Sequence, residues 1–343
     1  MARRMTTNIR DVAKAAGVSV ATVSKALNGY PTVNQKTRDK VLRIVREMGF
    51  RPNAAARALV GQRSMTIGVL LSTGLAHPFF TNVLAGMEEA LGNGGYDLLY
   101  LAQLSHHGKD YNFVRHCQSR NVEGVIVFGF QRDDLDIAGL IESQIPAVFI
   151  DLAVSGPRAG YIASDHAAGI EQAVCYLHGL GHERIAMIAD MPHSYVGRLR
   201  LEGYKNGLKT AGLRYGDLAV EEGDYSRDRG REAMKRLLHG EGSVPTAVIC
   251  CSDYAAFGAM DAIREAGLSV PEDISVTGFD DLEIARYARP GLTTVRQNME
   301  EIGRAAVERL DLMIREEWSE PPAIIIPTEL IVRDTCARPQ ERT

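Results

Sequence analysis

Polar and aromatic side chains that could bind a small molecule follow apolar runs along the larger, later part of the chain. The candidate residues are Phe79, Phe80, Asp151, Arg200, Tyr225, Ser252 and Asp280. Aromatic faces can stack on C–H groups, while carboxylates and an arginine fork can hold hydroxyl groups. This combination of residue types suits a polyhydroxylated ligand.

The motifs that catalysis usually requires are missing from the sequence. It contains no GxGxxG, HExxH or GxSxG motif and no phosphate-binding GxxxxGKS or GxxxxGKT, and the glycines of GNGGYD lack the required spacing. The histidines that could serve an enzyme are His77, His106, His107, His182 and His193, and they form no paired motif. An enzyme is one alternative, since doubly wound folds host many chemistries. We expect no catalytic residue, no metal ion and no cofactor.

The elements that must position the candidate residues alternate between strands and helices from Ile67 onward. Strands are predicted at Ile67–Leu71, Leu98–Leu101, Gly124–Phe128, Ala147–Ile150, Ile185–Ala189, Leu218–Glu221, Ala247–Cys251 and Ile274–Gly278. Helices are predicted at Phe80–Leu91, Ala167–His178, Val196–Thr210 and Tyr254–Ala266. This alternation implies an α/β fold with two doubly wound parallel-sheet subdomains. Because ligands bind beyond the carboxyl ends of parallel strands, the candidate residues should meet between the subdomains.

Charge separates a basic beginning from an acidic remainder. Residues 1–63 hold 13 Lys or Arg against three Asp or Glu, whereas the rest of the chain holds 26 against 40. A basic segment joined to an acidic body predicts a module that binds a polyanion. No apolar run reaches the roughly 18 residues of a membrane span and no signal-peptide core is present, so we expect a cytoplasmic protein. The five cysteines show no CxxC spacing, which predicts free thiols.

The basic segment is predicted to fold as three short helices. N-caps are expected at Asn8, Ser19 and Asn34, ahead of helices at Ile9–Ala16, from Val20 and at Gln35–Met48. Gly17 supplies the turn after the first helix, with a positive φ. Two short helices joined by a glycine-containing turn and closed by a third form the helix-turn-helix arrangement.

The amino-acid sequence of this segment is more specific than its pattern of three helices. The runs IRDVAKAAGVSVATVSKALNG and TRDKVLRIVREMGFRPNAAARAL closely resemble the N-terminus of lactose-repressor (LacI/GalR) family regulators, over residues 8 to 60. The resemblance implies that the second helix enters the major groove and that Val20, Ala21 and Lys25 face base edges. Lys25 can donate to a guanine or a phosphate, while Val20 and Ala21 offer only apolar contact. For Val20, packing inside the three-helix core is the alternative.

Further DNA contacts are implied on both sides of this helix. Ser19, Thr22, Ser24 and Asn28 are candidate phosphate contacts, which position the domain without reading sequence. After Asn53, the stretch AAARALV is too short to be a stable isolated helix. In the family it folds as a hinge helix when two subunits meet on DNA. The residue that matches Leu59 is wedged there into a minor-groove step, with basic neighbours such as Arg57.

The later segments GVLLS, GHERIAMIAD, PTAVICCSD, SVTGFDD and LTTVRQ resemble the family's effector domain, which is similar to periplasmic sugar-binding proteins. By family position, Asp151, Arg200 and Asp280 are effector contacts, and Phe79, Phe80, Tyr225 and Ser252 line the site. A family contact before Arg200 corresponds to Ser194 and Val196, and neither residue type is informative. The one tryptophan, Trp318, is expected outside the pocket. Asp253 has the alternative role of a helix cap, and Arg198 that of a solvated surface residue.

The resulting hypothesis is a LacI-type transcriptional repressor controlled by a sugar or sugar derivative. We predict a helix-turn-helix domain at 1–52, a hinge at 53–63, and an effector-binding and dimerisation domain at 64–343. Its first subdomain would span about 64–163 and 293–323, and its second about 164–292 and 324–338. Expected partners are a palindromic double-stranded operator, a sugar-like effector and a second copy of the chain, as a homodimer or a tetramer, without a membrane. A secreted solute-binding protein and a regulator with a protein co-effector are the remaining alternatives.

Overall fold

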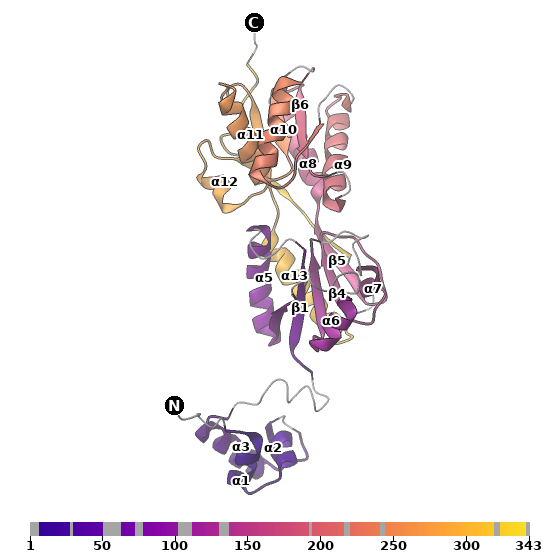
Figure 1. Ribbon diagram of the computed structural model, residues 1–343, viewed down its shortest axis with the longest axis vertical. Helices are drawn as coiled ribbons and strands as arrows, with labels where there is room; N and C mark the ends of the chain where they lie inside the picture. The colour runs from indigo at the N-terminus through magenta and orange to yellow at the C-terminus, as the bar shows by residue number, and fades with distance from the viewer. Residues whose placement is uncertain are drawn as a thin grey trace. The chain divides into compact units, whose positions relative to one another are not determined.

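The described part of the first compact unit of the computed structural model, Met1–Ser64, has three short helices (Figure 1). The structure describes residues 7–27, 30–50, 63–72, 78–101, 112–129, 137–191, 194–215, 220–240, 244–318 and 323–340. The helices are α1 (Ile9–Ala16), α2 (Val20–Leu27) and α3 (Gln35–Glu47). Val12, Val23, Val41 and Ile44 are buried at their shared core. The predicted three-helix arrangement is confirmed.

The ends of these helices carry the predicted caps. The Asn8 side chain accepts hydrogen bonds from the backbone of Arg10 and Asp11, and the Asp11 carboxylate accepts one from the Asn8 backbone, which completes a capping box. Gly17 ends α1 with a φ of 64°, a backbone conformation that glycine adopts without steric cost. Asn34 caps α3 through the backbone N–H of Thr37. Helix α3 ends one residue earlier than predicted, with Met48 as its C-cap.

The second unit, Met65–Thr343, contains two six-stranded sheets. The first sheet has the order β11-β5-β4-β3-β1-β2, and all its pairs are parallel. Its strands are β1 (Thr66–Leu71), β2 (Asp97–Tyr100), β3 (Gly124–Phe128), β4 (Ala147–Ile150), β5 (Ala159–Ser164) and β11 (Ala323–Ile326). Helices α5 (Pro78–Gly94) and α13 (Met299–Ile314) share a core with one face, and α6 (Phe113–Ser119) and α7 (Ile137–Ile141) with the other.

The second sheet has the order β12-β10-β9-β8-β6-β7, in which only the β10–β12 pair is antiparallel. Its strands are β6 (Ile185–Ala189), β7 (Val220–Glu222), β8 (Ala247–Cys250), β9 (Ser275–Asp280), β10 (Thr293–Arg296) and β12 (Glu329–Ile331). Its covering helices are α8 (His166–Gly179), α9 (Tyr195–Thr210), α10 (Arg227–His239) and α11 (Asp253–Glu265), with the short α12 (Glu283–Tyr287) after β9. Helices α8 and α9 share a core with one face, and α10 and α11 with the other.

The chain crosses between the sheets three times, after β5, after β10 and after β11. The predicted subdomain limits differ from these crossings. Strand β10, at 293–296, pairs with β9 in the second sheet, although 293–323 was predicted to belong to the first subdomain. Strand β11, at 323–326, pairs with β5 in the first sheet, although 324 was predicted to open the return to the second. The pairing of these short strands depends on distant partners, which a local sequence pattern does not contain.

The structure also bears on two expectations, one about membrane-spanning segments and one about the cysteines. No helix in the described part of the chain is long and apolar enough to cross a bilayer. All five cysteines carry free thiols, as predicted. Burial raises the pKa of the Cys117 thiol to about 11, so it stays protonated and behaves as a small apolar core residue.

Candidate functional site

Helix α2 presents a small-residue and basic face on the surface of the first unit. Val23 and Ala26 are buried against the other two helices, whereas Ala21 and Lys25 are exposed. Val20 is 41% exposed, so the alternative of a core role for Val20 is wrong. The helical period places the exposed residues on the side opposite the core. This face could therefore contact a partner without disturbing the fold.

Hydroxyl groups flank this face at the start of α2. Ser19 is exposed and its Oγ accepts a hydrogen bond from the Thr22 backbone at 3.1 Å, as predicted for an N-cap. Its hydroxyl also pairs with Thr22 Oγ1 at 2.8 Å. Thr22 and Ser24 are half-buried. The other predicted DNA contacts, Asn28, Asn53, Arg57 and Leu59, lie outside the described residues.

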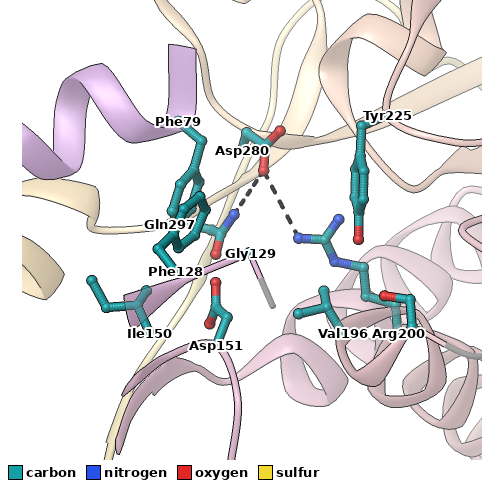
Figure 2. Close-up of a pocket in the computed structure, with 11 residues that line it drawn as sticks. Phe79, Phe128, Gly129, Ile150, Asp151, Val196, Arg200, Tyr225, Asp280 and Gln297 are labelled. Carbon is teal, nitrogen blue, oxygen red and sulfur yellow. Dashed lines mark hydrogen bonds and ion pairs between the residues drawn. The ribbon is translucent and has the colours of Figure 1, made fainter. Parts of the chain in front are cut away.

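A cavity of about 130 Å³ lies where the strand ends of the two sheets face each other (Figure 2). Its lining residues are Phe79, Phe128, Gly129, Ile150, Asp151, Ser194, Val196, Arg200, Tyr225, Asp280 and Gln297. Phe128, Asp151 and Asp280 stand at or just after the carboxyl ends of β3, β4 and β9. Residues from both sheets thus contribute, as the position rule for parallel sheets predicts.

One wall of the cavity is aromatic. The rings of Phe79 and Phe128 are stacked, with centroids 5.2 Å apart and planes within 7°. Phe80 packs beside Phe128 at 6.2 Å, but it is buried in the core of the first sheet and does not line the cavity. Because Phe79 and Phe80 are adjacent on helix α5, their side chains point in different directions. Of these two predicted lining residues, only Phe79 reaches the cavity.

Asp151 and Arg200 are joined through a buried histidine that the sequence analysis did not select. His166 Nε2 lies 2.9 Å from Asp151 Oδ1, and His166 Nδ1 lies 3.4 Å from Arg200 Nε. A guanidinium can only donate, so Nδ1 accepts and Nε2 carries the proton that bonds Asp151. Burial lowers the pKa of His166, with Asp151 opposing and Arg200 supporting that shift. His166 therefore holds both pocket residues as a neutral imidazole.

Arg200 is enclosed by further partners from the second sheet. Its Nη1 donates to the Cys251 carbonyl, and its Nη2 lies 3.9 Å from Asp280 Oδ1. The guanidinium carbon stands 3.8 Å from the centre of the Phe279 ring, a cation–π distance. The Tyr225 ring lies on another side at 5.7 Å. Figure 2 shows the guanidinium directed at Asp280, with the Tyr225 ring beside it. Together these contacts stabilise the buried cation and fix its orientation.

Asp280 completes this buried polar chain. Gln297 Nε2 donates to Asp280 Oδ1 at 2.7 Å. Burial raises the pKa of Asp280 to about 7, while Arg200 and Gln297 act in the opposite direction. Asp280 also has a φ of 121°, which is rare for a residue with a side chain. The polar groups of the pocket thus run from Asp151 through His166, Arg200 and Asp280 to Gln297.

Tyr225 reaches the cavity from the loop after β7. Its hydroxyl donates to Asp190 Oδ2 at 2.5 Å. Burial raises the pKa of Tyr225 well above its usual value, so the phenol stays protonated. The hydroxyl proton is therefore committed to Asp190, and the ring supplies an aromatic face to the site.

Two residues near the pocket have structural roles. Ser252 does not line the cavity: its Oγ caps helix α11 through the Ala255 backbone and donates to the Tyr225 carbonyl. Asp253 is the first residue of α11 rather than its cap, and its carboxylate accepts from Thr294 Oγ1 at 2.5 Å and from the Leu282 backbone at 2.7 Å. Both residues thereby fix the loops that carry Tyr225 and Asp280.

The remaining alternatives concern surface positions. Arg198 is exposed and stacks at 5.9 Å over the ring of Tyr195, which agrees with a solvated role. Trp318 packs against the core of the first sheet and does not line the cavity, as expected.

The structure adds lining residues that the sequence analysis did not select. They are Phe128, Gly129, Ile150 and Gln297, together with Ser194 and Val196, which were considered uninformative. A sequence signal existed for Phe128 and Ile150, because each ends a predicted strand and so stands at the predicted ligand edge. Gln297 follows β10, a strand that was not predicted. Ser194 caps helix α9 through the Gly197 backbone and lines the cavity at the same time.

Two family profiles match the chain. One, described as "Bacterial regulatory proteins, lacI family", covers residues 8–53, and the other, a "Periplasmic binding protein-like domain", covers residues 174–336. The transcriptional regulator CelR of Thermobifida fusca is 34% identical over 342 residues, covering 98% of this chain and 100% of CelR. The transcriptional repressor PurR of Pasteurella multocida is 33% identical over 327 residues, covering 95% of this chain and 97% of PurR.

Solved structures give the same relationship. The lac repressor dimer, bound to operator and the anti-inducer ONPF, is 31% identical with a TM-score of 0.83, covering 96% of this chain and 99% of the repressor chain. The complex of the regulator CelR with cellobiose is 32% identical with a TM-score of 0.71, covering 96% of this chain and 99% of the CelR chain.

Proposed function

The chain belongs to the lacI family of bacterial regulatory proteins and is a transcriptional regulator, and from that premise we propose that it is a repressor controlled by a sugar or sugar derivative. One observation carries the proposal: a single chain combines a helix-turn-helix with a pocket of aromatic rings, carboxylates and a guanidinium between two sheets. Such a lining suits a polyhydroxylated ligand. The cellobiose in the solved complex of CelR, at 32% identity, supports a sugar as the effector.

On the DNA side, helix α2 reads the major groove. Lys25 supplies a base-edge donor, while Val20 and Ala21 offer apolar contact to a thymine methyl. Ser19, Thr22, Ser24 and Asn28 contact phosphates. Asn53, Arg57 and Leu59 belong to a hinge segment that folds when two copies meet on the operator, with Leu59 inserted into a minor-groove step. The exposure of Val20, Ala21 and Lys25 on one face supports this assignment.

On the effector side, Asp151, Arg200 and Asp280 hold ligand hydroxyl groups, with Phe79 and Tyr225 as ring platforms. The lining of one cavity by all five side chains supports this assignment. Phe80 and Ser252 support these residues from outside the cavity. Because the lining comes from both sheets, a bound ligand bridges them and favours one relative orientation of the two.

The repressor acts as a homodimer in the cytoplasm, where chromosomal DNA is found, and reads a palindromic operator. A two-fold dimer presents two identical recognition helices, so the DNA site carries the same symmetry. Effector and operator affinity are then coupled through the relative orientation of the sheets, and thermodynamic linkage makes this coupling reciprocal. The solved lac repressor dimer on operator supports this mechanism.

A thermal-shift screen against sugars and purines, followed by DNA binding, tests the proposal. A ligand that binds the folded chain raises its melting temperature by mass action. It should also change the affinity for an operator duplex that the protein selects from a random pool. Arg200→Lys, which loses the guanidinium fork, should weaken both responses, and Arg198→Lys on the same helix is the matched control. A ligand that raises the melting temperature without any effect on DNA affinity would contradict the proposal.

A further inference from the structure

Gln297 brings an unpaired hydrogen-bond acceptor to the pocket wall. The residue is 4% exposed, and its Nε2 donates to Asp280 Oδ1 at 2.7 Å. This bond assigns the ends of the amide, because a carboxylate accepts, and it leaves Oε1 without a partner among the described residues. A buried acceptor in this state costs free energy until a donor reaches it. Because Gln297 lines the cavity, a bound ligand can supply that donor.

Tyr225 and Asp190 add acceptors to the same region. The Tyr225 hydroxyl uses its proton in the hydrogen bond that it donates to Asp190 Oδ2. Toward a ligand, the hydroxyl oxygen can therefore only accept. Asp190 is 4% exposed and does not line the cavity, and its other oxygen has no partner within the described ranges. Among the lining residues that the structure describes, Gln297 Oε1 and the Tyr225 oxygen are therefore groups that can only accept from a ligand.

The one cationic donor in the described part of the lining is largely engaged by the protein itself. Arg200 is 2% exposed and directs N–H groups at His166 Nδ1 and the Cys251 carbonyl, with Nη2 near Asp280. The Phe279 ring covers the guanidinium at 3.8 Å. What remains free on Arg200 can orient one ligand oxygen. It does not offer the two-pronged site that a phosphate or carboxylate prefers.

The charges of the lining point the same way. Among the described lining residues, Arg200 is the one cation, and it faces the carboxyl groups of Asp151 and Asp280. His166 is neutral, and Asp190 lies directly behind Tyr225. A ligand anion would lose its hydration and meet carboxylates in a buried setting, where like charges repel strongly.

From these observations we infer that the effector is rich in hydrogen-bond donors and carries no phosphate or carboxylate group. The inference rests on the proposed sugar-controlled function and narrows its ligand class to uncharged hydroxyl-rich sugars. Their hydroxyl protons pair with Gln297 Oε1 and the carboxylates, and their C–H faces lie against Phe79. One water occupies roughly 10–15 Å³ of cavity volume. The cavity of about 130 Å³ therefore has room for one sugar ring.

Matched ligand sets test the inference on the full-length protein. Calorimetric titration compares D-glucose with glucose 6-phosphate and glucuronate, D-galactose with galacturonate, and D-ribose with ribose 5-phosphate. The neutral member of a set should bind, and its anionic derivatives should bind at least about tenfold more weakly. An anionic derivative that binds as tightly as its neutral parent, or more tightly, overturns the inference.

Variants of the lining test the cause of this selectivity. Gln297→Leu removes the unpaired acceptor and should weaken binding of the neutral sugar about tenfold, the effect of a lost hydrogen bond in a buried site. Gln118→Leu, at an exposed position on helix α6, is the matched control and should leave binding unchanged. At pH 8, above the pKa of about 7 that burial gives Asp280, the carboxylate is ionised. There Asp280→Asn removes a negative charge and should narrow the gap in affinity between a neutral sugar and its anion several-fold. An unchanged gap would overturn the electrostatic argument.

Operator binding separates this inference from the proposed function. A sugar phosphate or uronate that binds more tightly than its parent and changes operator affinity would overturn the inference and leave the proposed function standing. A neutral purine that binds in place of every sugar and changes operator affinity would contradict sugar control, and with it the sugar class named here, while the exclusion of anionic ligands would stand.

Discussion

At the residue scale, the pocket is organised around one buried cation. Arg200 contacts the neutral His166, the Cys251 carbonyl and the Phe279 ring as well as the carboxylate of Asp280. Taking a cation out of water is favourable only when hydrogen bonds and opposite charge replace its hydration. These contacts come from several separate segments of the chain. The orientation of Arg200 therefore depends on the correct positions of these segments, and His166 links it to Asp151 at the end of a first-sheet strand.

The ionisation of Asp280 should make stability depend on pH. Burial raises its pKa from an ordinary 3.8 to about 7. Between about pH 4 and pH 7 the folded chain thus keeps a proton that the unfolded chain has released, so this group's contribution to stability falls as the pH rises through that window. In Asp280→Asn this decline should disappear. Melting temperatures of both proteins at pH 5 and pH 8 check it, and a parallel change in wild type and variant would refute it.

Lys25 should carry base discrimination at one position of each half-site. Losing a base contact typically costs about 1–3 kcal/mol and relaxes specificity at that position. Lys25→Ala should therefore weaken binding to the selected operator more than binding to an operator changed at that base pair. Fluorescence anisotropy against single-base operator variants measures this, with Lys36→Ala on the exposed start of α3 as the same-charge control. An equal loss for every variant would identify Lys25 as a phosphate contact.

At the scale of elements, periodicity predicted the central strands and helices α5, α8, α9 and α11, whereas helices α10 and α13 were not predicted. Helix α9 was predicted to begin at Val196 and begins at Tyr195, and β3 and β4 have their predicted bounds. Strands β5, β10, β11 and β12 were not predicted. Strands β10, β11 and β12 have only three or four residues each, which leaves little periodicity to detect. The prediction of Gln297 depended on β10, so it was missed with that strand. His166 was missed because its neighbours Asp151 and Arg200 meet only in the folded chain.

The crossing of helices α5 and α13 gives an element-scale prediction. A Cβ atom at Gly303 would lie 1.9 Å from the Val83 carbonyl oxygen, and one at Gly86 would lie 1.9 Å from the Glu300 carbonyl oxygen. The two backbones touch, so Gly303→Ala must push the helices apart, at a cost of about 1–3 kcal/mol or more. Gly139→Ala in helix α7, where nothing lies within 4 Å, is the control and should be neutral or stabilising. Urea unfolding measures both, and equal midpoints would contradict the close crossing.

At the scale of the whole chain, charge distinguishes a basic first segment, residues 1–63, from an acidic remainder. The basic first segment, with 13 Lys or Arg against three acidic residues, is suited to phosphate. The remainder, with 26 basic against 40 acidic residues, repels it. The acidic remainder therefore adds no non-specific affinity for DNA.

Residues 1–63 should therefore supply essentially all of the affinity for DNA. Each neutralised phosphate releases counterions, so the logarithm of affinity should fall with the logarithm of salt concentration at a slope of about −0.9 per contact. A chain of residues 64–343 lacks the basic segment and should not bind the operator at any salt concentration tested. Because its sheets and pocket residues all lie beyond residue 64, it should still bind the effector that the full-length protein binds. Operator titrations of both proteins from about 50 to 200 mM salt, paired with calorimetry of the effector, measure the two halves of this expectation. Operator binding by the shortened chain would show that the acidic body contacts DNA, and the assignment of DNA recognition to the first helices would then be wrong.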